Sequence, residues 1–166
     1  MRSGPRNQKS AAPQRSAYVD GLAMLARREL SEAQMRERLS RRGHSEDDTA
    51  SAIERLKNDR ALDDVRVAEA MARTETSVKG RGKLRVKRAI QNAGISPDIA
   101  RRAVDAAFTD IDSDDFIERA LGRRLRGGRS IADDREFQRL YRYLVMQGFE
   151  SDRVLKLLST KRRRQA

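Results

Sequence analysis

VKRAIQNAGISPDIARRAV, residues 86–104, is the middle copy of a pattern that occurs three times in this chain. The first copy, MRERLSRRGHSEDDTASAI, begins at Met35, and the third, LYRYLVMQGFESDRVLKLL, begins at Leu140. Apolar residues coincide at the first, fifth and last positions of the three copies, and glycine coincides at the ninth. Self-similarity at a fixed period is typical of tandem supersecondary units. The alignment therefore predicts three structural repeats.

Each copy is predicted to hold two helices that are separated by its glycine. A helix can end at a glycine without strain, because only glycine takes the left-handed conformation there freely. In the middle copy, Ser96 is the expected N-cap of the next helix and Pro97 its first residue. In the first copy, Ser45 is the expected N-cap, and the three acids after it favour the positive end of the helix dipole. Ser31 and Gln34 have the spacing of a capping box that opens the first helix.

A further helix precedes each copy, because apolar residues recur there at helical spacing. These residues are Tyr18, Leu22 and Leu25, then Val67, Ala68 and Met71, then Phe116, Ile117, Ala120 and Leu121. No segment alternates apolar and polar residues as a strand does. We therefore expect an all-α fold of three tandem three-helix repeats that form an elongated, curved rod.

The expected boundaries follow from this pattern. The three repeats are 17–60, 61–108 and 109–160, and the basic segments 1–16 and 161–166 are expected to be disordered tails. We expect RALDD (60–64) to join the first two repeats tightly, and the acidic TDIDSDD (109–115) to be a more mobile joint.

The composition excludes several classes of protein. The chain has 166 residues, of which 37% are charged and only 4% aromatic, and it contains no cysteine, so disulfides and thiolate metal sites are excluded. No apolar run approaches the roughly 20 residues of a membrane span, and the N-terminus lacks the apolar core of a secretion signal. We expect a soluble cytoplasmic protein that has no contact with a membrane.

The net charge of +12 is unevenly distributed. Each tail carries an excess of +4, repeat 61–108 carries another +4, and the other two repeats are neutral. Charge that only keeps a protein in solution does not need to be concentrated in particular segments. A basic surface that is merely solvated remains an alternative. The distribution favours a polyanionic partner.

The stretch GRGKLRVKRAIQNAG (80–94) concentrates this charge. Five basic residues fall within eight positions with no acid among them, while the apolar residues keep a helical spacing. They are Arg81, Lys83, Arg85, Lys87 and Arg88. None is the Asn or Gln that reads adenine edges, so the stretch resembles a phosphate-contacting surface more than a sequence reader. Because no core position is touched, we expect replacement of Arg85, Lys87 and Arg88 to leave stability nearly unchanged.

The sequence offers no convincing catalytic or metal site. His44, the single histidine, aligns with Ile95 and Phe149, which favours packing over catalysis. The acid pairs at 63–64, 114–115 and 133–134 each precede a predicted helix, where carboxylates act as caps. Neither glycine-rich stretch, 80–82 or 126–130, matches a phosphate-binding loop. We predict a binding protein, not an enzyme, with no catalytic residue, cofactor or metal.

Several kinds of nucleic-acid binder remain open at this point. Three helices per repeat also suit a sequence-specific helix-turn-helix protein, and the charge suits a general DNA- or RNA-coating protein. The aromatic residues of the third repeat could form a stacking platform, but their largely helical spacing favours a role in the core.

The chain resembles the RecX family of bacterial recombination regulators. LAMLARRELSEAQMRERLSRRGHSEDD (22–48) is similar to the first repeat of that family. The resemblance continues through LDDVRVAEA (62–70), KGRGKLRVKRAIQNAGI (79–95) and REFQRLYRYLVMQGFESDRVLKLL (135–158). Two positions depart from the family pattern: Val67 replaces a usual aromatic residue, and Lys83 replaces a common proline.

The resemblance implies a role in DNA repair, recombination and the SOS response. RecX-like proteins bind RecA, mainly as its filament on single-stranded DNA, and reduce ATP hydrolysis, filament extension and strand exchange. The expected partners are thus RecA, its filament and DNA, the last bound without sequence preference, and the chain itself is expected to be a monomer. The five basic residues of 81–88 are the first candidates for this contact, and Arg123, Arg124 and Arg126 are the second.

Overall fold

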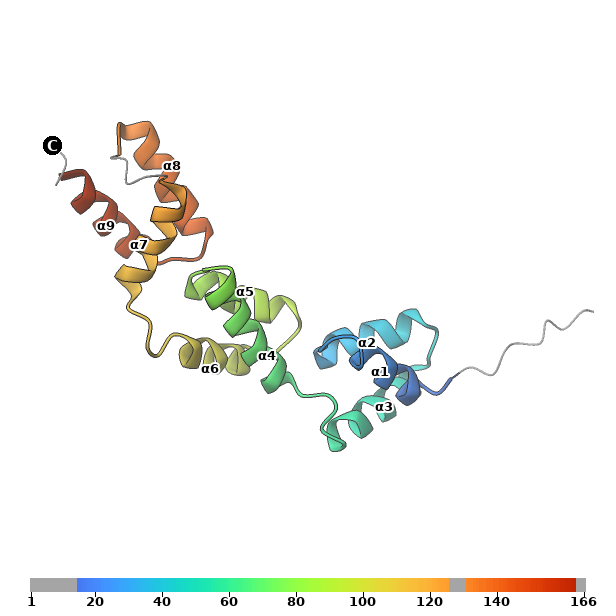
Figure 1. Ribbon diagram of the computed structural model, residues 1–166. Coiled ribbons are helices and arrows are strands. Elements are labelled where there is room, and N and C mark those ends of the chain that lie inside the picture. Colours follow the sequence, from blue (N-terminus) through green and yellow to red (C-terminus); the bar gives the residue numbers. More distant parts are fainter. Residues whose placement is uncertain (1–14, 126–130, 164–166) are drawn as a thin grey trace, which may run out of the picture. The chain divides into compact units, whose positions relative to one another are not determined.

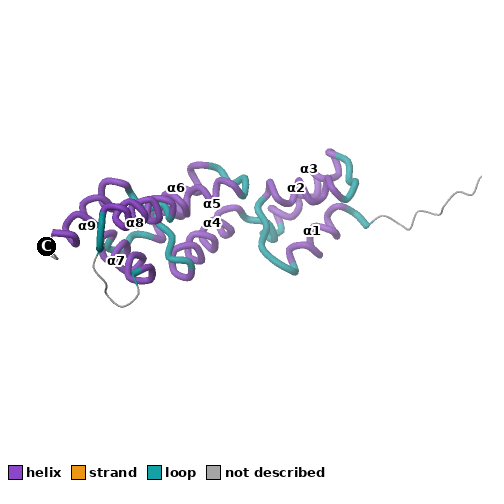
Figure 2. Tube along the Cα trace, turned by 90° about the horizontal axis from the view of Figure 1, so that it is seen from above, coloured by secondary structure: helices purple, strands orange, loops and turns teal. Residues whose placement is uncertain are grey.

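The computed structural model describes residues 15–125 and 131–163, and there it contains helices and connecting loops but no strand (Figures 1 and 2). The first three helices are α1 (Ala17–Leu25), α2 (Glu32–Arg41) and α3 (Glu46–Asn58). They are followed by α4 (Asp64–Arg73), a π-helical turn η1 (Thr74–Val78), α5 (Lys83–Asn92) and α6 (Pro97–Ala107). The last three are α7 (Ser113–Arg124), α8 (Asp134–Met146) and α9 (Ser151–Arg163). The all-α prediction is confirmed.

The predicted helix ends are confirmed at the three aligned glycines. Gly43, Gly94 and Gly148 have φ angles of 87°, 80° and 91°, which is the left-handed region that glycine tolerates. After two of these glycines, the next residue forms a hydrogen bond back to the helix. The N–H of His44 donates to the carbonyl of Leu39, and the N–H of Phe149 donates to the carbonyl of Leu144. The aligned glycines therefore identified real helix termini.

The predicted caps are also present. The Oγ atom of Ser31 accepts from the N–H of Gln34 at 3.1 Å, and the Gln34 side chain accepts from the N–H of Ser31 at 3.3 Å, which completes the capping box. Ser45 and Ser96 cap α3 and α6. The N-cap of α7 is Asp112 and not the predicted pair 114–115. The side chain of Asp112 accepts hydrogen bonds from the backbone N–H groups of Asp114 and Asp115.

The chain divides into two compact units, and the division falls close to an expected repeat boundary. The first unit comprises residues 1–29 and 35–62, and the second comprises 30–34 and 63–166. The division thus falls within RALDD, the segment that we expected to join two repeats tightly. The acidic joint 109–115 lies inside the second unit, with buried Phe108 and Phe116 beside it. The arrangement as a curved rod, and the three-repeat boundaries, stay predictions.

The first unit has a small aliphatic core. Met35, Leu39, Ile53 and Leu56 have at most 1% of their surface exposed, and removing such side chains from water contributes roughly 1.5–3 kcal/mol each. Gly21 of α1 lets Leu56 of α3 approach closely, since a Cβ at Gly21 would lie 2.7 Å from the Leu56 Cδ1 atom.

The second unit shares one continuous core over α4 to α9. Its aromatic residues are part of this core, because Phe116 contacts both Phe108 and Phe149 edge to face, with ring centroids 5.8 and 5.6 Å apart. The prediction that these aromatic residues fill the core is confirmed for Phe116 and Phe149, which are buried. The core thus passes directly through the predicted acidic joint, which explains why 61–108 and 109–160 form one unit.

The C-terminal helix is longer than predicted. α9 continues to Arg163, three residues beyond the expected end of the third repeat at residue 160. Lys161 pairs with Glu118 at 3.2 Å, and Arg162 pairs with Asp134, so acids on α7 and α8 hold the first tail residues in helical form. The tail segments 1–14 and 164–166, and Arg126, lie outside the described residues.

Candidate functional site

The basic stretch begins at a helix end that has no capping side chain of its own. Gly82 is the N-cap of α5 and offers no side-chain hydrogen bond, so the first N–H groups of the helix need other partners. The end of α8 supplies them. The N–H of Gly82 donates to the carbonyl of Gln147 at 2.9 Å, and the N–H of Leu84 donates to the carbonyl of Gly148 at 3.1 Å. The carbonyl groups at the end of α8 thus accept hydrogen bonds from N–H groups at the start of α5.

This contact depends on two glycines that lie against each other. A Cβ atom on Gly82 would collide with the backbone carbonyl of Gly148, and one on Gly148 would collide with the backbone nitrogen of Arg85. Only residues without side chains allow the two backbones to come this close. Gly82 and Gly148 therefore fix the start of α5 on the end of α8.

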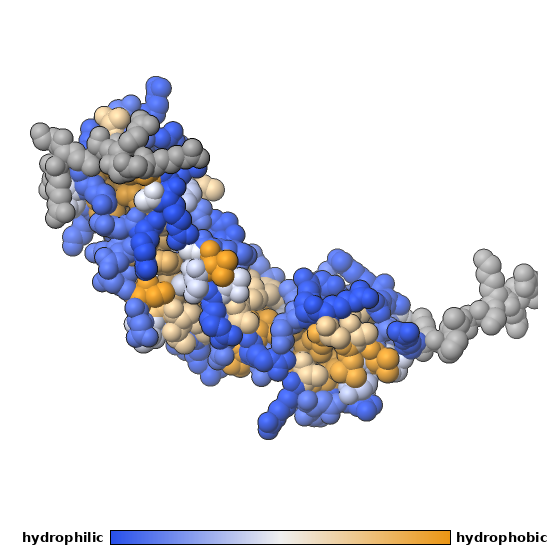
Figure 3. All heavy atoms as spheres, viewed as in Figure 1, coloured by the Kyte–Doolittle hydropathy of each residue, from blue (hydrophilic) through white to orange (hydrophobic). Residues whose placement is uncertain are grey.

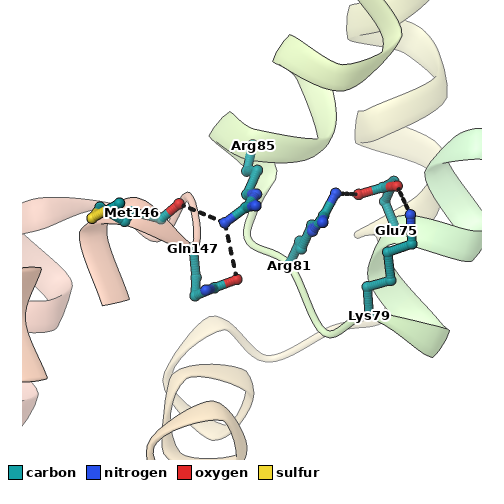
Figure 4. A network of polar contacts seen from close by, with 6 residues as sticks. All are labelled: Glu75, Lys79, Arg81, Arg85, Met146 and Gln147. Atoms are coloured by element: carbon teal, nitrogen blue, oxygen red, sulfur yellow. Dashed lines mark hydrogen bonds and ion pairs between the residues drawn. The ribbon is translucent and has the colours of Figure 1, made fainter. Parts of the chain in front are cut away.

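Arg85 strengthens the same junction with its side chain. Its guanidinium donates to the carbonyl of Met146 at 3.1 Å and to the Gln147 side-chain oxygen at 3.3 Å (Figure 4). A cation at the C-terminal end of a helix is favoured by the helix dipole and by the open carbonyls there. Arg85 is therefore partly structural, which corrects the expectation that its replacement leaves stability unchanged.

Arg81 forms an ion pair with a residue of the π-helical turn η1. The carboxylate of Glu75, on η1, binds both Arg81 and the Nζ atom of Lys79, the latter at 2.6 Å (Figure 4). Only 8% of the Glu75 side chain is exposed. Burial raises the pKa of Glu75, but the hydrogen bonds from Lys79 and Arg81 outweigh burial and hold the pKa below its ordinary value. Two cations share one carboxylate, so this cluster keeps a net positive charge.

A groove of ≈ 630 Å³ lies beside this junction in the second unit. Its lining comes from the loop before α5, from α5, and from the end of α8 with the glycine that follows it: Arg81, Leu84, Arg85, Arg88, Ala89, Asn92, Val145, Met146 and Gly148. We call it the α5–α8 groove. Arg88 is exposed and has no partner within the described part of the chain.

The structure separates the five predicted residues into two groups. Arg81, Arg85 and Arg88 line the α5–α8 groove, whereas Lys83 and Lys87 are not among its lining residues. The ammonium group of Lys83 lies 5.6 Å from the centre of the Phe108 ring, which is a cation–π contact. The basic stretch is therefore not one continuous face.

The second group of candidates lies close to this site only in part. A Cβ on Gly80 would collide with the guanidinium of Arg123, which places that side chain against the loop before α5. The guanidinium of Arg124 lies instead over the ring of Tyr143, 5.3 Å from its centre. Sequence reasoning missed Met146 and Gln147, although the absence of a capping residue before Lys83 was a signal that another segment had to cap α5.

The single histidine has a structural role in the first unit. The Nε2 atom of His44 lies 2.9 Å from the carboxylate of Asp20, which also pairs with Arg42 at 2.8 Å. The hydrogen bond with His44, supported by the charge of Arg42, lowers the pKa of Asp20 against the opposing effect of burial. The described residues contain no group of three or more His, Asp or Glu side chains that could hold a metal ion.

Comparison with known proteins identifies the family. Models of the first and second three-helix domains of RecX match residues 17–56 and 63–104. The chain is 31% identical to the regulatory protein RecX of Chromohalobacter salexigens over 81% of this chain and 86% of that protein. It is 31% identical to the regulatory protein RecX of Syntrophotalea carbinolica over 91% of this chain and 99% of that protein. The chain belongs to the RecX family.

Solved RecX structures agree with this fold. The crystal structure of RecX from Lactobacillus salivarius matches with a TM-score of 0.71 at 20% identity, over 87% of this chain and 93% of that one. In the described residues of this RecX family member, no helix is long and apolar enough to cross a membrane.

Proposed function

We propose that this RecX family member binds the RecA recombinase, above all the RecA filament on single-stranded DNA, and inhibits its ATPase, filament extension and strand exchange. It acts as a monomer in the cytoplasm and catalyses no reaction of its own. The observation that carries the proposal is family membership over nearly the whole chain, because the matched relatives are regulatory proteins named RecX.

The α5–α8 groove supplies the physical basis for binding. Within the described residues, Arg88 is unpaired, Arg85 is bound only by neutral oxygen atoms, and Arg81 shares Glu75 with a second cation. A filament of protein on DNA offers phosphates and carboxylates to such a surface, and uncompensated guanidinium groups bind both. Long-range attraction also raises the rate of encounter with a negatively charged filament.

The decisive experiment is the DNA-dependent ATPase of RecA, measured with this protein at less than one molecule per RecA. We expect inhibition at that ratio, because a regulator of a filament affects many subunits from one site. A protein that only coats DNA needs enough copies to cover the strand, so inhibition that appears only at saturating amounts would contradict the proposal. A sequence-specific helix-turn-helix protein would instead prefer one duplex strongly over scrambled DNA.

The basic stretch of α5 is tested by charge reversal at side chains that have no partner in the described part of the chain. Lys87→Glu combined with Arg88→Glu should greatly reduce inhibition with little change in the melting temperature, because neither side chain has a partner in the described residues. The matched control is Arg36→Glu with Arg38→Glu on α2, two exposed residues that are likewise unpaired there. If both double variants inhibit RecA equally well, the basic stretch of α5 is not the site.

A further inference from the structure

The α5–α8 groove contains exposed aliphatic side chains as well as cations. Leu84 is 55% exposed and Met146 is 74% exposed, and both lie among the lining residues with Ala89 and Val145 beside them. Most large apolar side chains of the second unit are buried, so two such residues in one groove are unusual. Figure 3 shows hydrophobic atoms at the surface of this unit between hydrophilic ones. The groove is therefore amphipathic.

The charge around these apolar residues has one sign. The described residues that line the groove include three arginines and no acid. The carboxylate of Glu75 and the negative end of the α8 dipole offset part of this charge, but Lys79 shares Glu75 and Arg88 has no partner in the described part of the chain. A complementary ligand must therefore carry both negative groups and an apolar group.

The lining residues favour a protein over a nucleic acid as that ligand. Sites for single-stranded nucleic acid stack the bases on aromatic rings, and the lining residues of this groove include no aromatic side chain. Flexible methionine and leucine side chains instead accommodate aliphatic side chains of a partner, and methionine is frequent on such protein-binding surfaces. The volume of ≈ 630 Å³ is sufficient for more than one side chain.

We infer that the α5–α8 groove binds an acidic segment of a partner protein, with an aliphatic side chain packed on Leu84 and Met146 and carboxylates bound by Arg85 and Arg88. The inference deepens the proposed function and rests on it, since it assigns this groove to the protein component of the filament and not to its DNA. Arg85 is held at the end of α8, so its guanidinium is already oriented before the partner arrives.

Site-specific crosslinking tests this assignment, because the chain contains no cysteine. A benzophenone maleimide is attached to the cysteine of Met146→Cys and, as a control, to that of Leu155→Cys. The side chain of Leu155, on α9, is 49% exposed and is not among the lining residues of the groove. Both proteins are irradiated on RecA filaments that contain fluorescent single-stranded DNA. We expect an adduct with RecA from position 146 and much less from position 155. An adduct with the DNA, or equal adducts from both positions, would overturn the inference.

A binding measurement without RecA separates this inference from the proposed function. The probes are two fluorescent 12-residue peptides, repeats of Asp-Leu-Glu and of Asp-Ser-Glu, and a 12-nucleotide oligothymidine. We expect the leucine peptide to bind about tenfold more tightly than the serine peptide, a preference that Leu84→Ser abolishes. Equal binding of both peptides, or a Leu84→Ser effect on oligothymidine alone, would refute the groove assignment even if RecA inhibition holds. If RecA is not inhibited but the leucine preference is found, only the proposed function fails.

Discussion

Arg85 donates a hydrogen bond to the main-chain carbonyl of Met146, so a residue near the start of α5 caps the last residue of α8. The two residues are 61 positions apart in the sequence. This side chain therefore contributes to stability and to the charge of the α5–α8 groove at the same time. Variants at Arg85 must be interpreted with both roles in mind.

Arg85→Ala is expected to lower the free energy of unfolding by about 1–2 kcal/mol, because it removes charge-assisted hydrogen bonds to the end of α8. Chemical denaturation measures this loss. Arg88→Ala on the same helix is the matched control, with an expected change within about 0.5 kcal/mol, since Arg88 is exposed and unpaired in the described residues. Equal stability of the two variants would mean that the Arg85 contact contributes nothing.

Gly148→Ala should destabilise the second unit by about 2 kcal/mol or more, because the residue has a φ of 91° and its new Cβ would collide with the backbone of Arg85. Thermal unfolding measures the effect. Gly122→Ala in α7 is the control, because a Cβ there meets nothing within 4 Å and alanine favours a helix interior by roughly 0.5–1 kcal/mol. A Gly148→Ala variant that is as stable as Gly122→Ala would disprove the close backbone approach.

Gly94→Val is expected to cost ~1–3 kcal/mol, because a β-branched residue is strained at a φ of 80°. A Cβ at this position would also collide with the side chain of Ala33. The variant Ala33→Gly separates the two effects. In that background the collision is absent, so Gly94→Val should cost less but still destabilise. A melting temperature identical to that of the unmodified chain would show that the helix does not end at Gly94.

Glu75→Gln should destabilise the protein by about 1–3 kcal/mol at neutral pH, because a buried carboxylate that binds Lys79 and Arg81 is lost. Since the folded state lowers the pKa of Glu75, the ionised carboxylate stabilises the protein above the unfolded pKa, and this contribution is lost as the pH falls through the folded pKa. The difference in the free energy of unfolding between the unmodified protein and Glu75→Gln should therefore decrease below about pH 4.5. A difference that is constant from pH 7 to pH 3 would contradict this role.

The sequence predicted the helices well because their signals are local. The three aligned glycines and the pair Ser31 and Gln34 act within one turn of their own helix, so spacing alone located them. The five basic residues also have a local signal, namely charge at helical spacing, and this signal suggested a single free face. Their actual environment depends on contacts with distant residues, which no periodicity records.

The contacts that the sequence could not predict are long-range or occupy unexpected positions. His44 aligns with two apolar residues, yet its partner is the carboxylate of Asp20, 24 positions away. Glu75 lies in a π-helical turn, for which TETSV gives no clear signal, and its burial became evident only with its two cationic partners. The groove residue Met146 belongs to a different predicted repeat from α5, so sequence spacing could not bring the two together.

The mutual capping of α5 and α8 has a consequence for synthesis of the chain on the ribosome. Arg85 precedes its partner Gln147 by 62 positions, so α5 is made well before the carbonyls that cap it. At roughly 5–20 residues per second, this delay is about 3–12 s, during which the first unit can already fold. The α5–α8 groove is thus assembled only after α8 has been made, and a nascent chain that stops before α8 has no such groove to offer.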